Sequence, residues 1–383
     1  MAKTSFIHST AKIKVIGLGG GGSNAITRML RGEIRGVEFI AMNTDAQALA
    51  ICEAPVRIQL GEKLTKGLGA GGDHIVGQKA AEENRDEIKE LVQGTDMVFI
   101  TCGMGGGTGT GSAPIVAEMA KQCGALTIGI VTKPFTFEGT HRSRVAEEGI
   151  ERLLGKLDTL IIIPNDRLLS LCDAQTNIDA AFTMADEVLK HGVQAISEVI
   201  TVPGLINLDF ADVKAIMQNA GPAWMSIGLG SGKNRAVDAA KEALASPLLD
   251  VSIEGAKGIL FNVIGNSSLT LFEVNEAAQV IRDAVDPSAN IIFGVAQDQS
   301  MTKDIRITLI ATGFASKVGA SAQDEEINKV LKGLKTEDEL DVPSFLRLPL
   351  FNQRRRMPAP GPKVIKPAPQ TREVQKASGE PTK

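Results

Sequence analysis

The sequence predicts an α/β protein: a doubly wound parallel-sheet domain, joined by a long central helix to a smaller α+β domain and followed by a disordered C-terminal tail. Three observations support this fold class. In the first half, short β-branched runs alternate with helical segments. Glycine-rich loops follow several of these strands. From Thr176, apolar residues recur at helical spacing for about 23 residues, or roughly 35 Å.

Chain length, net charge and the cysteine and histidine content exclude several classes of protein. The 383 residues suggest two or three domains, and 41 lysine and arginine residues against 45 acidic residues give a net charge of −4. No nucleic-acid partner is therefore expected. The four cysteines and four histidines are scattered, which argues against a disulfide framework or a structural metal. Without a signal-peptide pattern or a run of 18 apolar residues, a soluble, cytoplasmic protein is expected.

The first motif follows a predicted strand at residues 13–16. Residues 17–24 satisfy the pattern G-x-G-x-x-G between this strand and a helix ending at Leu30, which is the setting of the dinucleotide fingerprint. A second strand, residues 38–42, ends at Asn43, and Asp45 supplies an acidic group that can bind a ribose. A Rossmann-type NAD-dependent dehydrogenase is therefore one alternative for the function.

A third glycine loop, residues 67–73, weakens that alternative. A dinucleotide-binding fold needs one glycine loop, whereas a nucleoside triphosphate held from several sides needs several. The loop contains Ala70, Gly71 and Gly72.

The most glycine-rich loop runs from Gly103 to Ser112, between a strand at residues 97–101 and the start of a helix. A backbone without Cβ atoms can approach a ligand closely, and its N–H groups and the helix dipole favour negative charge. A phosphate chain is the expected occupant, with Thr108 and Thr110 adding hydroxyl donors. Because the P-loop lysine is missing, the phosphates must be held by backbone dipoles and a metal ion. A flexible linker is the alternative for this stretch.

Further strands are predicted at residues 126–132 and 159–163, with a helix at 142–156 between them. Ligands of such sheets bind at the carboxyl ends of the strands, where the glycine loops and residues 133–139 and 164–166 fall. The second half predicts an α+β domain without phosphate loops, with strands at 226–229, 258–264, 291–296 and 305–311 and helices at 235–245 and 271–284.

The long helix has Thr176 and Asp179 in capping-box spacing, and it leads to Asn207, Asp209 and Asp212. These three side chains can orient a water molecule, although a polar turn with an aspartate capping the next helix explains the same spacing. A helix length separates them from the predicted nucleotide pocket, so they can act only on a nucleotide held by another copy. Head-to-tail stacking of this kind generates a filament.

The glycine loop from Gly105 to Gly111 resembles the signature of the tubulin/FtsZ family of GTPases, in the form typical of its bacterial cell-division members. Residues 17–24, 43–49, 207–212 and 340–347 look like further segments of this family in the same order, so the resemblance covers about residues 11–347. It implies a GTPase that assembles head to tail into the cytokinetic ring of a dividing prokaryotic cell. A non-polymerising, nucleotide-gated scaffold of the same family remains the alternative.

The resemblance also implies the site residues. GTP or GDP would be bound with Mg²⁺ held by phosphates and water rather than by direct protein ligands, and a monovalent-cation requirement stays open. Glu138 would contact the ribose, Arg142 the ribose and phosphates, and Asn165 and Asp186 the guanine, stacked on Phe182. For Phe182, a place in the core stays open as an alternative to stacking, since both bury the ring, and without the family Asp186 would be read as a solvated helix residue. The remaining implied nucleotide contacts are Gly19, Gly20, Gly21, Gly22, Ser23, Asn24, Asn43, Asp45, Ala70, Gly71, Gly72, Gly103, Gly105, Gly106, Gly107, Thr108, Gly109 and Thr110.

For catalysis, the next subunit would insert Asp209 and Asp212 to polarise the attacking water, with Asn207 positioning it. The segment from Leu340 to Arg347 would dock on membrane-tethering and regulatory division proteins, so that membrane contact is indirect and the protein gathers at mid-cell. The basic, proline-rich stretch after it either contacts acidic lipid or other filaments or is a solvated extension. The expected organisation is a leader (1–10), GTP-binding domain (11–175), central helix (176–202), activation domain (203–314), linker (315–339), partner-binding peptide (340–347) and basic tail (348–383).

Overall fold

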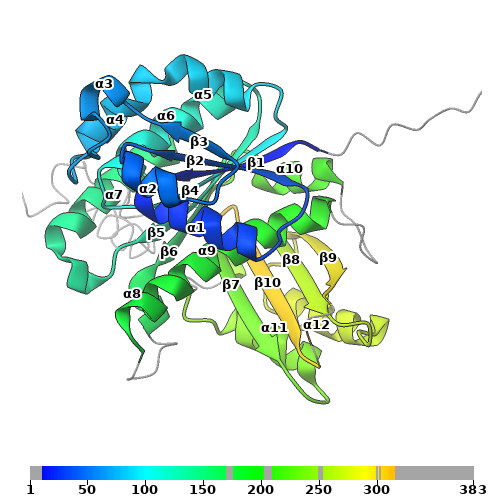
Figure 1. The fold of residues 1–383 in the computed structure, drawn as a ribbon. Coiled ribbons are helices and arrows are strands. Elements are labelled where there is room, and N and C mark those ends of the chain that lie inside the picture. Colours follow the sequence, from blue (N-terminus) through cyan, green and yellow to red (C-terminus); the bar gives the residue numbers. More distant parts are fainter. Residues whose placement is uncertain are drawn as a thin grey trace, which may run out of the picture. The chain divides into compact units, whose positions relative to one another are not determined.

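The computed structural model describes residues 11–169, 176–201, 209–248, 253–298, 301 and 303–314 (Figure 1). All of them belong to the first of two compact units, residues 1–317, whereas the second unit, 318–383, lies wholly outside the described residues. The predicted leader, Asn207, the linker, the partner-binding peptide and the basic tail therefore also lie outside them.

A ten-stranded sheet runs through this unit in the order β3-β2-β1-β4-β5-β6-β7-β10-β8-β9. From β3 to β7 all neighbours pair in parallel, while β10 is antiparallel to both β7 and β8, and β9 is parallel to β8. The strands are β1 (Ile13–Leu18), β2 (Val37–Asn43), β3 (Val56–Gln59), β4 (Met97–Gly103), β5 (Leu126–Lys133), β6 (Thr159–Pro164), β7 (Gly221–Gly230), β8 (Gly258–Gly265), β9 (Asn290–Gln297) and β10 (Ile305–Thr312).

The helices cover both faces of this sheet. They are α1 (Gly19–Arg31), α2 (Ala46–Ile51), α3 (Glu62–Thr65), α4 (His74–Glu83), α5 (Arg85–Val92), α6 (Thr108–Gln122), α7 (Thr140–Leu154), α8 (Asn165–Leu169), α9 (Ile178–Thr201), α10 (Phe210–Met217), α11 (Arg235–Leu244) and α12 (Leu271–Asp283), with 3₁₀ turns η1 (Thr136–Glu138) and η2 (Ile253–Gly255). None of the helices in the described part of the chain combines the length and apolarity of a membrane-spanning helix.

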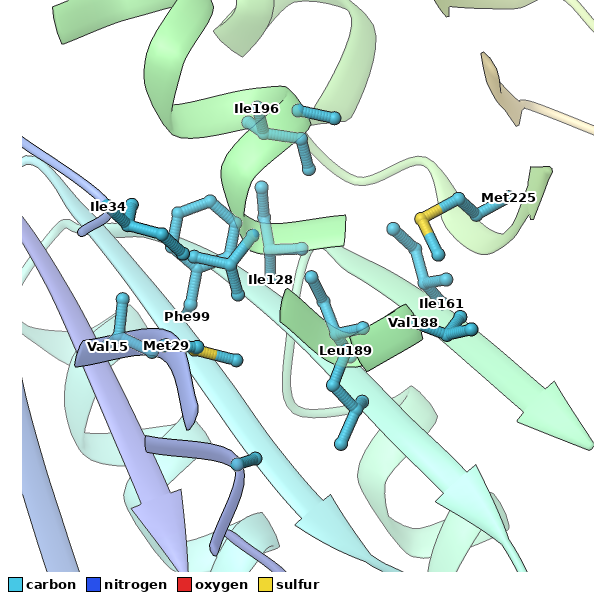
Figure 2. Close-up of a cluster of buried hydrophobic side chains, with 14 of the residues drawn as sticks. Val15, Met29, Ile34, Phe99, Ile128, Ile161, Val188, Leu189, Ile196 and Met225 are labelled. Atoms are coloured by element: carbon cyan, nitrogen blue, oxygen red, sulfur yellow. The ribbon is translucent and has the colours of Figure 1, made fainter. Parts of the chain in front are cut away.

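Strand alternation divides the core into layers. On one face of the parallel strands, Val15 and Phe99 pack against α1, α9 and α10, and Figure 2 shows Met29 of α1 and Leu189 of α9 beside these side chains. The next residues along the strands, such as Ile16 and Ile100, face the opposite way and pack against α4, α5, α6 and α7. A third cluster packs α11 and α12 against β7 to β10.

The α/β class and the mostly parallel sheet are confirmed, but the two predicted halves share one continuous sheet. The structure begins β7 at Gly221, five residues before the predicted strand, and Gly221, Pro222 and Ala223 pair with the first three residues of β6. Pro222 lacks an N–H group and Gly221 has a positive φ of 71°, so this stretch has the composition of a turn. The helices α2, α4 and α5 were also missing from the sequence-based prediction.

The start of α9 differs from the prediction by one residue. Asn177, and not Thr176, caps the helix: its Oδ1 accepts a hydrogen bond from Ala180 N at 2.7 Å. The helix then continues for 24 residues to Thr201.

Candidate functional site

A cavity of about 240 Å³ lies at the carboxyl ends of β1, β4, β5 and β6. The strand order reverses between β1 and β4, and such a reversal is where open α/β sheets bind their ligands. Glycine residues line one end of the cavity, and polar and aromatic side chains line the other. The lining residues are Leu18, Gly19, Gly20, Gly21, Gly103, Met104, Gly106, Gly107, Thr108, Gly109, Thr132, Pro134, Glu138, Arg142, Asn165, Phe182, Ala185, Asp186 and Leu189.

The glycine end is built from the N-termini of α1 and α6. Helix α1 follows β1 without a connecting loop, because Gly19 takes a positive φ of 67° that turns the chain from strand to helix. A Cβ on Gly19 would lie 3.0 Å from Gly109 N, so the two helix starts touch. Neither start has a side-chain cap among the described residues. Uncapped N–H groups and two helix dipoles therefore face the same space, which suits a polyanion.

The loop before α6 is fixed from inside. Gly105 has a φ of 92°, and a Cβ there would lie 2.6 Å from the carbonyl oxygen of Arg142. Its N–H donates to Thr110 Oγ1 at 2.9 Å. Thr108 lines the cavity as expected, whereas Thr110 is buried behind it and closes the loop instead of presenting a hydroxyl to a ligand.

Apart from Gly71 and Gly72, the other predicted residues around the glycine end support this wall and do not line it. Asp45 caps α2, with Oδ1 accepting from Gln47 N at 2.9 Å and Ala48 N at 3.0 Å. Its carboxylate therefore serves the local helix and not a ribose, which removes the main support for a dehydrogenase. Asn24 lines an adjoining cavity. The supporting set is Gly22, Ser23, Asn43, Asp45, Ala70, Gly105 and Thr110.

The third glycine loop reaches the same place. Its Gly69 N–H donates to the carbonyl oxygen of Thr44 at 3.2 Å. A Cβ on Gly107 would lie 2.9 Å from Ala70 Cβ, so the loop stands directly against the start of α6. Gly71 and Gly72, both with positive φ, have open space around them and can approach a ligand.

The opposite end of the cavity carries side chains suited to a planar base. Asn165 is buried, and its Oδ1 has no hydrogen-bond partner among the described residues. This acceptor is therefore available to a hydrogen-bond donor of a ligand. Phe182 is 40% exposed and meets Phe135 edge-on at 5.5 Å between ring centroids. Its ring is thus open to the cavity, unlike a core residue, and can stack on a base.

Asp186 is enclosed, unlike a solvated helix residue. Its side chain is 15% exposed, and its Oδ2 lies 3.5 Å from Arg28 Nε. Burial raises the pKa of Asp186 to about 6, and the Arg28 guanidinium opposes that rise. An ionised carboxylate in this position accepts hydrogen bonds from two adjacent donors.

Between the two ends, Glu138 and Arg142 form an ion pair of 3.1 Å. The other oxygen of Glu138 accepts from Phe135 N at 2.8 Å, which fixes the carboxylate at the edge of the cavity. Arg142 remains half exposed and can turn toward an anion.

Asp209 and Asp212 belong to a helix that is bonded to the opposite, amino end of the parallel strands. They begin α10, whose Met217 carbonyl oxygen accepts from Thr159 Oγ1 at the amino end of β6, whereas Asn165 directly follows the carboxyl end of that strand. Asp209 occupies the N-cap position, yet its side chain makes no capping hydrogen bond. The capping explanation for this carboxylate is therefore wrong.

Several lining residues were missing from the sequence-based prediction. Thr132 is the next-to-last residue of β5, and Pro134 directly follows that strand. Residues 133–139 were expected at the ligand-binding end of the sheet, but neither Thr132 nor Pro134 was assigned to the site. Arg28 lies one helical turn after Asn24 on α1, a spacing that places both on one face. Its contact with Asp186, 158 positions later in the chain, leaves no local signal.

Within the described residues, no three histidine, cysteine, aspartate or glutamate side chains come together to hold a metal ion. The carboxylates that line the cavity, Glu138 and Asp186, stand away from its glycine end.

Comparisons with known proteins agree over most of the described chain. The GTPase domain of the Tubulin/FtsZ family matches residues 12–173, and the C-terminal domain of the FtsZ family matches residues 221–315. An FtsZ dimer from M. jannaschii is 49% identical, with a TM-score of 0.77, covering 80% of this chain and 89% of that chain. A point mutant of M. jannaschii FtsZ gives 49% identity and a TM-score of 0.78, over 80% and 92% of the two chains. The GTPγS-bound protofilament of CetZ2 from Haloferax volcanii shares the fold, with a TM-score of 0.69 and 17% identity over 85% and 100% of the two chains.

Proposed function

The chain belongs to the tubulin/FtsZ family of GTPases, and from this premise we propose that it hydrolyses GTP between the subunits of a head-to-tail filament that serves prokaryotic cell division. One observation carries the proposal. The cavity follows the carboxyl end of β6, while α10, with Asp209 and Asp212, is attached to the amino end of the same strand. A subunit therefore presents a pocket at one end and two carboxylates at the other.

In this proposal the phosphates lie against the uncapped helix starts of α1 and α6, with Thr108 donating and Ala70, Gly71 and Gly72 on the γ-phosphate side. The ribose lies at Glu138 and Arg142. The guanine stacks on Phe182, with its ring donors meeting Asp186 and the unpartnered Oδ1 of Asn165. One end of the cavity offers N–H groups to an anion, and the other end offers hydrogen-bond acceptors to a base. This combination fits a guanine nucleotide.

Mg²⁺, when bound, supplies charge neutralisation on the phosphate oxygens. Among the side chains that line the glycine end, Thr108 would offer its hydroxyl oxygen, which suits an ion held mainly by phosphate and water. A monovalent cation remains a further candidate cofactor.

The chain's own residues then act by position and charge. Asp209 and Asp212 of the next subunit hold and polarise the water that attacks the γ-phosphate, and Asn207, outside the described residues, orients it. Because phosphoryl transfer depends chiefly on positioning and charge stabilisation, a pocket without its neighbour is nearly inactive. Assembly thereby activates hydrolysis.

Exposed apolar side chains surround the pocket and support association there. Leu68 of the third glycine loop is 85% exposed, and Phe137 beside Glu138 and Ile178 at the start of α9 are also exposed. Covering such side chains stabilises an interface. The FtsZ dimer and the CetZ2 protofilament among the similar structures are assemblies of those proteins, which is consistent with this use of the surface.

The test is the GTPase rate per subunit as a function of protein concentration. We expect a rate near zero below a threshold and a rise above it. A mixture of two inactive variants sharpens the test: Asp212→Ala retains the pocket, and Asp186→Asn retains the carboxylates of α10. Mixing them should restore hydrolysis, because some interfaces then combine an intact pocket with an intact Asp212. A constant rate per subunit and no recovery on mixing would instead favour the non-polymerising scaffold.

For cellular placement, the family indicates a cytoplasmic protein, and we propose that it concentrates at the mid-cell division site through the segment from Leu340 to Arg347. Pro343, Phe345 and Leu346 would anchor this peptide in membrane-tethering and regulatory partners. Deleting residues 340–383 should leave GTPase activity and assembly intact while abolishing mid-cell localisation. Loss of assembly in this truncated chain would contradict the assignment.

A further inference from the structure

We propose that Arg28 of α1 is a positioning residue for base recognition: it holds the Asp186 carboxylate as an anion directed at the base and so links the phosphate-binding helix to guanine selection. The inference rests on the proposed GTP-binding function and adds to it a residue and a pH dependence.

The guanidinium of Arg28 is attached to α9 at two points one turn apart. Its Nε lies 3.5 Å from Asp186 Oδ2, and its Nη2 donates to Thr183 Oγ1 at 3.2 Å. The buried Nε has no hydrogen-bond partner among the described residues, so the carboxylate 3.5 Å away is an ion-pair partner that a small shift would bring into hydrogen-bond contact. This two-point attachment restrains the side chain more than a single exposed ion pair would.

Asp186 stands between two cavities. A second cavity, of about 390 Å³, shares Phe182 and Asp186 with the first and is otherwise lined by Asn24, Thr27, Arg28, Arg31, Asp179 and Thr183. The carboxylate can thus receive a base from the first cavity while it contacts Arg28 in the second. Arg28 also lies on the helix whose first residues, Gly19 to Gly21, face the phosphate end.

The charge on Asp186 depends on this contact. Burial raises the pKa of Asp186 to about 6, and Arg28 is the cation that counteracts the rise. A protonated carboxyl group offers one acceptor fewer to guanine, whose edge presents two adjacent N–H donors. Without Arg28 the acid form would persist to higher pH.

The other charged side chains near the two cavities either form ion pairs of their own or are acidic. Arg31 pairs with Glu53, Arg142 with Glu138 and Lys190 with Glu187. Asp179, two turns before Asp186 on α9, is negative and can only disfavour ionisation. Within the described residues, Arg28 is therefore the cation in contact with Asp186.

The first experiment measures the GTP dissociation constant by calorimetry from pH 5.5 to 8.5 for the wild type, Arg28→Ala and Arg28→Lys. We expect wild-type affinity to fall below about pH 6. In Arg28→Ala the midpoint should move up by about one pH unit or more, so that the loss of affinity grows from a few-fold at pH 8.5 to about tenfold or more at pH 6.5. Arg28→Lys keeps the charge and should restore most of the midpoint. If Arg28→Ala is poorly folded, Arg28→Gln takes its place.

The second experiment compares GTP with inosine triphosphate, which lacks the 2-amino donor. Arg28→Ala should weaken GTP binding more than inosine triphosphate binding, because fewer hydrogen bonds to Asp186 are then lost. In an Asp186→Asn background, Arg28→Ala should have little further effect. Equal losses for both nucleotides with an unshifted pH midpoint would overturn the proposal and assign Arg28 a purely structural or phosphate-directed role. Failure of the wild type to bind GTP at any pH would refute the proposed function itself.

Discussion

The hydroxyl groups of Thr44 and Thr108 lie 2.6 Å apart and share a buried hydrogen bond. Thr44 follows β2, and Thr108 begins α6. The carbonyl oxygen of Thr44 also accepts from Gly69 N at 3.2 Å and from Thr65 Oγ1 at 3.3 Å. Thr44 therefore joins the start of α6 to the third glycine loop, so that two segments of the pocket wall are held by one residue.

Thr108→Ala should weaken GTP binding about tenfold, because it removes a hydroxyl from the cavity wall and leaves the Thr44 hydroxyl without its partner. Calorimetric titration with GTP measures this. Thr108→Ser, which keeps the hydroxyl, is the matched control and should bind nearly as well as the wild type. An unchanged affinity in the alanine variant would remove Thr108 from the binding set.

Thr110→Val should act on stability first. The hydroxyl of Thr110 accepts from Gly105 N inside the loop, and its loss leaves a buried N–H group unsatisfied at a cost of about 1–2 kcal/mol. Chemical denaturation without nucleotide measures this cost, with Thr110→Ser as control. A variant of unchanged stability that had lost GTP affinity would instead place Thr110 on the ligand.

Asp212→Ala should bind GTP normally and lose turnover by roughly a hundredfold or more, because the side chain is needed only at the neighbour's pocket. Parallel binding and phosphate-release assays separate the two effects. Asp238→Ala, at an exposed position on α11, is the charge-matched control and should retain full activity. Full turnover in Asp212→Ala would exclude its catalytic role.

Asp186→Asn should change the pH dependence of folding. Burial raises the folded-state pKa of Asp186 to about 6, above its unfolded value, so its favourable contribution is present at low pH and is lost as pH rises through 6. Relative to the wild type, the asparagine variant should therefore become more stable between about pH 4 and 7, by up to about 2 kcal/mol, while losing GTP affinity. Denaturation curves at several pH values measure the trend, and the opposite slope would contradict it.

His191→Gln should reduce the loss of unfolding free energy that occurs as the pH falls below 7. Burial lowers the pKa of His191 in the folded state to about 3, and the positive charges of Arg306 and Lys190 contribute to this lowering. As the pH falls, the unfolded state therefore binds a proton that the folded state does not bind. This contribution to stability is present above about pH 6.5 and is lost progressively as pH falls toward 3. The variant should lose about 2 kcal/mol less than the wild type between pH 7 and 4, as measured by denaturant titration.

Local sequence patterns predicted the parallel sheet and the phosphate end of the site, because a strand, glycine residues and a helix start are adjacent in the chain. They failed where a role depends on distant partners. Alternating threonines do not show that Thr108 faces the cavity and Thr110 the loop interior. Asp45 was assigned to a ribose by its distance from the first glycine loop, although the helix beginning at Ala46 offered a nearer use for it.

The pairing of β6 with β7 also depends on residues that are distant in the sequence. Proline is typical of turns, and Pro222 belongs to a sheet only because it pairs with β6, a strand far earlier in the chain. Likewise, no local pattern connects Arg28 to Asp186, since their contact depends on how α1 packs against α9.

The seam between β6 and β7 consists of three paired residues on each strand, and Pro222 provides no N–H group there. Helix α10 spans this seam, because its carbonyl oxygens accept from Thr159 Oγ1 of β6 and from Thr312 Oγ1 of β10. A twist across the seam would therefore tilt α10 and move Asp212. If Asp212 completes the neighbouring subunit's site as proposed, bending of a filament would change how well each site is completed, and the shape of the polymer would alter the rate at which it hydrolyses GTP.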